Sequence, residues 1–422
     1  MVETHDAEPI ESTMTSCIVV GGGPAGVMLA YLLARGGVPV TLLESHPDFD
    51  RDYRGDTVHP STLEAMDALG LSEKLHALPH GKIRAMRINT PDGERTMADF
   101  SRVRTRFPYI MAMPQARFLD FLAAEAARYP AFKLVMGGTV QRLIEENGTV
   151  AGVRYRDLQG NCHEVRSGLT VAADGRHSKV RSLAGLEPVR SAPPMDVLIT
   201  HLPKEPGDSG DDGTIHIGGG DFVVVFDRGE SWLIGYAYLK GGFQAIRSAG
   251  IGELVRHLGI VLPKWKERFA RHLTDWKQCP VLAVESNRLP VWHKPGLLLI
   301  GDAAHVMSPV GGVGINYAIQ DAIETANQLT AKLKAGAVTE ADLASVQQVR
   351  EWPVKVIQRV QKVIQDRIVA AGLKQGSAFR LPLPARILTA TPGLKWILPT
   401  ILGWGVRPAR VRTDCLSEAA SR

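Results

Sequence analysis

The sequence has four cysteines, Cys17, Cys162, Cys279 and Cys415, and none of them forms a CxxC pair. This spacing indicates neither a zinc site nor a disulfide framework. The sequence also lacks an HExxH stretch, a recognisable catalytic triad and paired carboxylates at a convincing spacing. We therefore expect no metal site and look for chemistry that a bound cofactor supplies.

No part of the chain reaches the roughly 18 unbroken apolar residues that a membrane-spanning helix requires. The start of the chain, MVETHDAEPIESTMTS, is acidic and polar, unlike a signal or transit peptide. We interpret residues 1–15 as a flexible tail and expect a cytoplasmic protein. The net charge is +5, but basic and acidic residues are interspersed, so we expect no nucleic-acid partner. The sequence makes no prediction of the oligomeric state.

The 422 residues are enough for two or three domains. From Cys17 the chain reads as strand CIVVG, a glycine-rich turn, helix AGVMLAYLLARGG and strand VPVTLLE, which is a complete βαβ unit. Apolar spacing predicts helices over 60–70 and 114–130. The dipeptide Asn147-Gly148 predicts a hairpin turn, and the region 190–290 shows strands with few helix signals. The pattern predicts an α/β fold with an inserted β-rich domain.

The segment VVGGGPAG places Gly21, Gly23 and Gly26 in a GxGxxG pattern between a strand and a helix. The first glycine permits a tight turn, the second lets a pyrophosphate approach the backbone, and the third allows close packing of helix and sheet. Glu44 ends the next strand, where a carboxylate accepts hydrogen bonds from a ribose. This context favours dinucleotide binding over a purely structural turn.

Two further motifs follow apolar strands. Asp174-Gly175 ends the strand GLTVAADG, which by itself fits an Asx turn as well as a ligand site. Gly301-Asp302 ends the strand LLLI, and a proline- and glycine-rich loop then leads into a helix from about Ile315. The start of that helix would favour negative charge on a ligand.

Together these three motifs resemble those of the class A flavoprotein monooxygenases, the single-component aromatic hydroxylases with the fold of para-hydroxybenzoate hydroxylase. The resemblance covers nearly all of residues 16–370. It implies a Rossmann-like FAD-binding domain with an inserted β-sheet substrate domain and C-terminal helices. The implied division is a FAD-binding domain of residues 16–75, 110–185 and 285–335, a substrate domain of 76–109 and 186–284, and a helical region of 336–422.

The resemblance also implies roles for individual residues. Glu44 would hold the FAD ribose, Arg54 would approach the pyrophosphate, and Asp302 would bind the ribityl or pyrophosphate region. The residues expected to bind the cofactor are Gly21, Gly23, Ala25, Gly26, Glu44, Arg54, Gln115, Arg117, Asp174, Gly301, Asp302, Pro309, Gly312, Gly314, Ile315 and Asn316. Backbone amides around Gly314 to Asn316 would face the pyrimidine edge of the flavin, with Pro309 on the reacting side.

The implied reaction is reduction of FAD by NADH or NADPH, formation of a flavin C4a-hydroperoxide with O2, and hydroxylation or epoxidation of a small molecule. The substrate would be an aromatic, polyketide-like or isoprenoid compound. Alternatives are another flavin redox enzyme, namely a halogenase or a prenyl reductase, and a non-redox FAD-containing cyclase or binding protein. The halogenase mark WxWxIP is absent.

We assign a part in catalysis to Pro309, Gly314 and His59. His59 would act as the base that deprotonates a phenol. His305 follows the GD motif, where we interpret it as a capping or packing residue in preference to a catalytic one. Trp232, Tyr236 and Tyr238 share strand parity, which fits either a substrate pocket or an ordinary packed face.

The segment 380–412 holds six Lys or Arg residues, no Asp or Glu, and apolar stretches. This segment has three interpretations: it contacts a membrane surface, it forms a lid over the substrate entry, or it packs on the substrate domain. Packing is favoured because prolines interrupt any long amphipathic helix.

Overall fold

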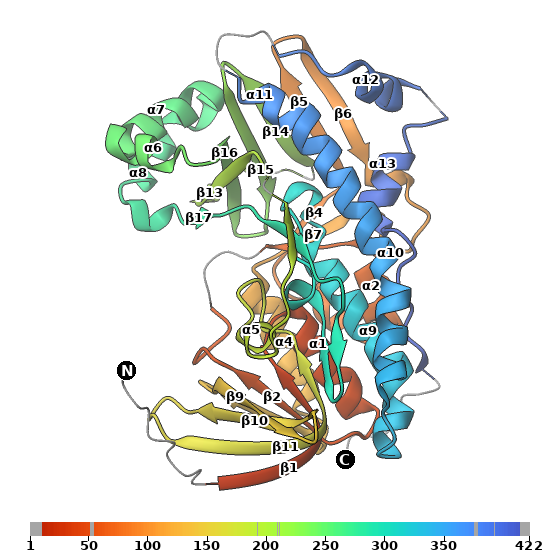
Figure 1. The fold of residues 1–422 in the computed structure, drawn as a ribbon. Helices are drawn as coiled ribbons and strands as arrows, with labels where there is room; N and C mark the ends of the chain where they lie inside the picture. The colour runs from red at the N-terminus through yellow and green to blue at the C-terminus, as the bar shows by residue number, and fades with distance from the viewer. Residues whose placement is uncertain are drawn as a thin grey trace.

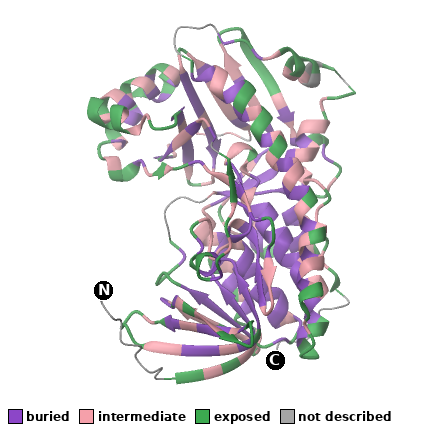
Figure 2. Ribbon diagram, in the orientation of Figure 1, coloured by how far each residue is buried: buried purple, intermediate pink, exposed green. Residues whose placement is uncertain are grey.

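The computed structural model describes residues 11–50, 55–191, 193–208, 210, 212–374, 379–391 and 393–413. Figure 1 shows one sheet with its helices at the bottom, a second sheet at the top, and a long helix, α10, that runs beside both. Figure 2 shows that buried residues concentrate around the lower sheet and at the junction of the two parts.

The lower sheet has the strand order β19-β20-β11-β1-β2-β8, and β10 and β9 continue from β11 as a hairpin. Strands β20, β11, β1, β2 and β8 are parallel to one another, as the βαβ pattern predicts. The bounds are β1 (Glu11–Val20), β2 (Val40–Glu44), β8 (Phe132–Met136), β9 (Thr139–Glu146), β10 (Thr149–Arg156), β11 (Cys162–Ala172), β19 (His293–Lys294) and β20 (Leu297–Leu299). Asn147 and Gly148 have φ of 50° and 77°, in the turn predicted for them.

Strand β1 begins earlier than the sequence suggested. Residues 11–15, which we expected in the flexible tail, are strand, and Glu11 pairs with His163 of β11. The long β11 offers backbone partners to them, and ladder hydrogen bonds form even where side chains such as Met14 stay exposed.

Three helices pack together on this sheet: α1 (Pro24–Arg35), α4 (Gln115–Ala126) and α9 (Gly314–Lys334). Helix α1 starts with a proline in its first turn, and residues 25–34 are all buried, so it is a core helix apolar on every side. The remaining elements of this part are short. They are α2 (Pro60–Ala68), α3 (Ser72–His76), α5 (Lys179–Leu183), β3 (Thr57–Val58), β4 (Gly81–Ile83) and β7 (Ile110–Ala112).

The upper sheet has the order β17-β13-β16-β15-β14-β5-β6. It joins two chain segments far apart in the sequence, because β5 pairs with β14. The bounds are β5 (Ala85–Thr90), β6 (Gly93–Asp99), β13 (Met195–Pro203), β14 (Asp212–Gly218), β15 (Asp221–Asp227), β16 (Ser231–Leu239) and β17 (Val281–Leu282), while β12 (Val189–Ser191) and β18 (Ser286–Arg288) form a separate pair.

Three short helices cover one face of the upper sheet: α6 (Phe243–Ala249), α7 (Ile251–Val261) and α8 (Lys266–His272). The sequence analysis missed them, having found few helix signals in this region. Leu254 and Leu258 of α7 are buried against the sheet, and their spacing of four residues was the available signal.

The C-terminal part contains α10 (Glu340–Ile364), a π-helical turn over Gln365–Val369, α11 (Ala370–Gly372), α12 (Leu383–Ala390) and α13 (Ile397–Pro399). Thr339 and Asp342 form a capping box that starts α10. Among the described residues, no helix is long and apolar enough to cross a membrane. The predicted fold class, an α/β nucleotide-binding domain with an inserted β-sheet and C-terminal helices, is confirmed.

Candidate active site

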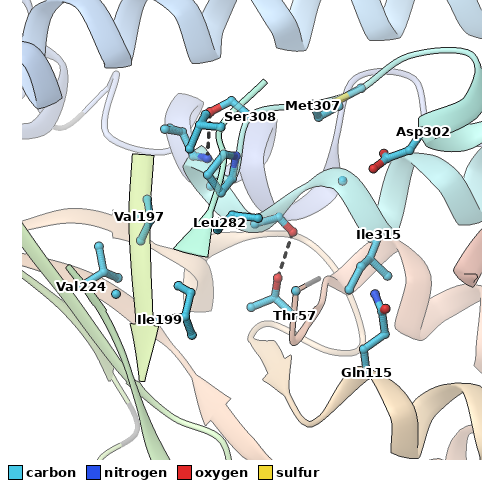
Figure 3. Close-up of a pocket in the computed structure, with 18 of the residues that line it drawn as sticks. Thr57, Gln115, Val197, Ile199, Val224, Leu282, Asp302, Met307, Ser308 and Ile315 are labelled. Carbon is cyan, nitrogen blue, oxygen red and sulfur yellow. Dashed lines mark hydrogen bonds between the residues drawn. The ribbon is translucent and has the colours of Figure 1, made fainter. Parts of the chain in front are cut away.

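One cavity of about 420 Å³ extends from the glycine-rich turn after β1 to the upper sheet and α10. Its near end is lined by Gly21, Gly23, Pro24, Ala25 and Glu44. Its middle is lined by Gly55, Thr57, Gln115, Asp174, Asp302, Pro309, Gly312, Gly314 and Ile315. Figure 3 shows residues from the middle and far parts of this cavity. Parallel-sheet proteins bind ligands at this edge, where the strands end.

The glycine-rich turn after β1 depends on its three glycines. Gly21 has φ +103°, and a Cβ there would lie 2.5 Å from the carbonyl oxygen of Ala173. A Cβ on Gly26 would lie 1.8 Å from the carbonyl oxygen of Gly21. At Gly23 the nearest atom would be 3.9 Å away, so this position faces open space at the start of α1. The turn therefore forms a cradle for a phosphate group.

Glu44 ends β2 and is buried. Its Oε2 accepts a 2.6 Å hydrogen bond from the amide of Gly22, and its Oε1 accepts one of 2.9 Å from the amide of His46. Oε1 also accepts from the Ser45 hydroxyl at 3.2 Å and pairs with the His46 ring at 2.7 Å, and Glu44 lines the cavity. The position fits the predicted ribose contact.

The DG motif combines both interpretations given to it. Asp174 lines the cavity, and its carboxylate also caps α5 by accepting hydrogen bonds from the Ser178 hydroxyl and, at 3.0 Å, from the Val180 amide. Burial raises the pKa of Asp174. Arg176, two residues later, also lines the cavity.

The GD motif is held in place by a buried ionic cluster that the sequence analysis did not predict. Asp321 of α9 accepts hydrogen bonds from the Gly301 amide (3.0 Å), the His305 ring (2.6 Å) and Arg350 of α10 (2.8 Å). Burial acts to raise the pKa of Asp321, but His305 and Arg350 lower it. His305 has a structural role through this ion pair and not by packing alone, and the cluster fixes the turn that carries Asp302.

The loop after the GD motif reaches the cavity with little side-chain bulk. Gly311 and Gly312 have φ of +80° and +64°, and a Cβ on Gly314 would meet nothing within 4 Å. Gly314 begins α9, whose first amides lack acceptors within the helix. This free space and these amides fit the flavin edge that the resemblance implies.

Asn316 differs from its predicted place. Its backbone N–H donates to the Val313 carbonyl at 3.0 Å. Its side-chain oxygen accepts 2.8 Å hydrogen bonds from the backbone N–H of His59 and from the Thr62 hydroxyl. Asn316 does not line the cavity, because its polar groups serve to join α9 to the start of α2.

Gln115 lies on the cavity wall, as Figure 3 shows. Arg117 does not line the cavity: its guanidinium donates to the Pro79 carbonyl at 2.8 Å and pairs with Glu230 at 2.6 Å. Two residues along a helix turn the side-chain direction by about 200°, so Gln115 and Arg117 lie on opposite sides of α4. Arg54 lies outside the described residues.

His59, the predicted base, lies behind the loop rather than in the cavity. Its Nδ1 hydrogen-bonds to the carbonyl of Leu402 at 2.7 Å, so it carries the proton there. Burial lowers the pKa of His59 to about 4, against the opposing effect of the Leu402 and Gly312 carbonyls. The geometry gives His59 a role in tying the C-terminal segment to the loop.

We expect acid to destabilise the wild type more than a His59→Asn variant. The unfolded chain takes up a proton near pH 6.5 and the folded chain only near 4, so the stabilising effect is complete above 6.5 and is lost as the pH falls toward 4. The full difference is roughly 3 kcal/mol. About 2 kcal/mol of this difference falls between pH 7 and pH 5, where urea unfolding measures it. An equal loss of unfolding free energy in both proteins would contradict the assignment.

Trp232, Tyr236 and Tyr238 do share one face of β16, but it is the face turned away from the cavity. They pack in the cluster with α7 and α8, and the Tyr236 hydroxyl donates to Asp221 at 2.8 Å. None of the three lines the cavity described above, so the structure favours the packed-face alternative, although Tyr236 borders a separate hollow with Asp221 and His257. The alternation of side chains along a strand separates its two faces but does not predict which face a layer of helices covers.

The residues that do line the far end of the cavity are the alternate positions of the same strand, Leu233, Gly235 and Ala237. Neighbouring strands add Val197, Ile199 and Val224, which Figure 3 shows directed toward the same space. The remaining apolar lining residues include Ile83, Met86, Ile88, Phe100, Met195, Ile215, Phe222, Phe226, Ile364 and Ile368. The strands give this end an apolar lining, and Glu285, after β17, is a charged residue beside it.

The C-terminal segment is partly a wall of the cavity. Leu398 and Leu402 line it, in accord with the packing interpretation. Before them, Leu383, Ile387 and Trp396 remain 66%, 49% and 51% exposed, so packing does not account for the outer part of the segment.

The parallel sheet, the glycine cradle, the buried Glu44 and the GD loop define an FAD-binding enzyme. A family model described as "FAD binding domain" matches residues 14–209 and 262–359. The chain belongs to this family and is a class A flavoprotein monooxygenase with the para-hydroxybenzoate hydroxylase-like fold.

Its relatives include 6-methylpretetramide 4-monooxygenase of Streptomyces rimosus, 31% identical over 98% of both chains. Protoasukamycin 4-monooxygenase of Streptomyces nodosus subsp. asukaensis is 26% identical, over 83% of this chain and 88% of the relative. The structure of p-nitrophenol 4-monooxygenase PnpA from Pseudomonas putida DLL-E4 superposes with a TM-score of 0.75 at 22% identity, covering 95% of this chain and 100% of that one.

Proposed function

We propose that this FAD-dependent monooxygenase uses NADH or NADPH and O2 to hydroxylate a largely apolar polycyclic aromatic or polyketide-like compound. The observation that carries the substrate class is the apolar far end of the cavity, built from β5, β13, β14, β15, β16 and α10. Such a surface favours apolar area on the substrate, and Arg176 and Glu285 are its charged neighbours in the same cavity.

The relatives support this proposal, since two of them are named as 4-monooxygenases of 6-methylpretetramide and protoasukamycin. Flavin-dependent brominase and halogenase structures also superpose on this chain, but at 16% and 19% identity, which shows the shared fold and not the reaction. We also propose a cytoplasmic location, because the three cysteines in the described part of the chain, Cys17, Cys162 and Cys279, are free thiols.

The residues of this chain divide the work along the cavity. Gly23 and the start of α1 would hold the pyrophosphate, Glu44 the ribose, and Asp302 the chain that leads to the ring. When bound, FAD supplies the transfer of an oxygen atom to an electron-rich carbon. Gly314 and Ile315, at the start of α9, present amides where negative charge on the ring is stabilised, and the apolar far end excludes water.

The test is a screen of the FAD-loaded protein for substrate-stimulated NAD(P)H oxidation, with hydrogen peroxide and product both measured. Neutral polycyclic phenols are expected to stimulate oxidation and to gain one oxygen atom. Stimulation by isoprenoids alone would reassign the reaction to epoxidation. Bound FAD that no reductant and substrate pair reduces would contradict the proposal.

We expect Asp302→Ala to lower FAD affinity by about tenfold, the effect of losing one charge-assisted hydrogen bond. Asp302 lines the cavity at the end of β20, next to Gly301. Flavin released on denaturation, divided by protein concentration, measures occupancy. Asp366→Ala, an exposed residue of the π-helical turn after α10 that pairs with Lys362, is the control. Equal FAD content in both variants would remove Asp302 from the site.

A further inference from the structure

Helix α10 carries a row of glutamines that hold the loop between the GD motif and α9. Gln358 donates to the carbonyls of Asn287 (2.9 Å) and Val306 (3.1 Å). Gln361 donates to the carbonyls of Ser308 (2.7 Å) and Val310 (2.8 Å). Since both partners of Gln361 are carbonyl oxygens, its NH2 group must face the loop.

Gln361 and Gln365 act on the part of the loop around Pro309. The two carbonyls bound by Gln361 belong to the residues on either side of this proline. Gln365 donates to the Ser308 hydroxyl at 2.7 Å, and that hydroxyl in turn accepts from the Val310 amide at 3.2 Å. Both glutamines are 3% exposed or less, so water does not replace these bonds.

The same stretch of helix also lines the substrate end of the cavity. Ile364, Ile368 and Val369 are lining residues, and positions 361, 364, 365 and 368 recur at the spacing that places side chains on one side of a helix. The helix becomes π-helical at Gln365–Val369, a distortion common at functional sites. One segment therefore touches both the loop and the space for the substrate.

We propose that Gln361 and Gln365 are positioning residues that fix the loop Ser308–Val310 against the flavin ring and join it rigidly to the substrate wall formed by Ile364 and Ile368. This inference rests on the proposed placement of FAD in the cavity. Losing the two side chains leaves buried carbonyls without donors, so the loop moves away from the ring together with the first turn of α9.

The experiment compares the FAD-loaded wild type with Gln361→Met/Gln365→Met, which keeps side-chain length and removes the donors. Hydrogen exchange of residues 306–316 is expected to accelerate at least tenfold. The midpoint potential of the bound flavin is expected to become more negative, since the start of α9 stabilises the reduced ring less. Neither readout requires a substrate, so failure of the proposed reaction and failure of this inference remain distinguishable.

Gln347→Met is the matched control, because Gln347 lies on the same helix and bonds to Pro290 and Trp292 instead. It is expected to leave both readouts unchanged. A lower melting temperature of the double variant with unchanged exchange and potential would overturn the proposal. If the double variant does not fold, Gln365→Met alone, which loses only a bond to a hydroxyl, is expected to show the same changes at smaller size, and no change would overturn it.

Discussion

Replacing Gly23 by valine is expected to give a folded protein that does not retain FAD. Gly23 caps α1 with φ −76° and ψ −178°, a conformation open to any residue. A Cβ there would have no neighbour nearer than 3.9 Å, so the free protein accommodates it. The same Cβ and its methyl groups would occupy the space where the pyrophosphate must touch the backbone.

We expect the dissociation constant for FAD to rise at least 100-fold in Gly23→Val, about 2.7 kcal/mol, with little change in melting temperature of the apo protein. Flavin fluorescence titration of apo protein measures the affinity. Gly168→Val is the matched control, because its Cβ would also have a nearest neighbour at 3.9 Å, in an exposed strand position away from the cavity. Equal FAD affinity in the two variants would place the pyrophosphate elsewhere.

Gly235→Phe is expected to retain FAD and to lose turnover of large substrates. Gly235 lines the cavity on β16, and a Cβ there would be in ordinary contact, 3.5 Å from Val197 and 3.6 Å from Ile199. The backbone therefore tolerates a side chain, but the phenyl ring would fill the apolar end of the cavity. We expect kcat/KM to fall at least 100-fold, about 2.7 kcal/mol.

Tyr236→Phe is the control for that substitution, one residue along the same strand and on the opposite face. It loses the hydrogen bond to Asp221, which costs about 1 kcal/mol of stability, and kcat/KM is expected to stay within about threefold of wild type. Steady-state kinetics with a substrate from the screen, and flavin content, measure both variants. A larger loss of kcat/KM in Tyr236→Phe than in Gly235→Phe would assign the substrate wall to the aromatic face of β16.

The near half of the site was predictable because its constraints are local. Gly21, Gly23 and Gly26 act at fixed spacings within one turn, and their steric demands come from backbone atoms that every sequence carries. Glu44 ends the strand that must follow such a turn. For the same reason the hairpin at Asn147-Gly148 and the helices α2 and α4 lie where their patterns predicted them.

The predictions that differ from the structure concern positions where the local sequence pattern fits more than one arrangement. The alternation of β16 predicted two distinct faces, but only the packing of α7 and α8 decides that Trp232, Tyr236 and Tyr238 are covered and that Gly235 faces the cavity. Arg117 and Asn316 were assigned to the cofactor by motif position, whereas their partners lie on distant segments.

The sequence by itself determined the nucleotide-binding turn, the fold class and the FAD-dependent chemistry, because these depend on backbone geometry within short segments. The tertiary structure alone decided the apolar substrate wall, the cluster of Asp321 with His305 and Arg350, and the hold of Gln361 and Gln365 on the Pro309 loop. The physical reason is that each of these features joins segments that are distant in the sequence. His305 and Asp321 are 16 residues apart, and Ser308 and Gln365 are 57 residues apart. Such contacts form only when the whole chain packs.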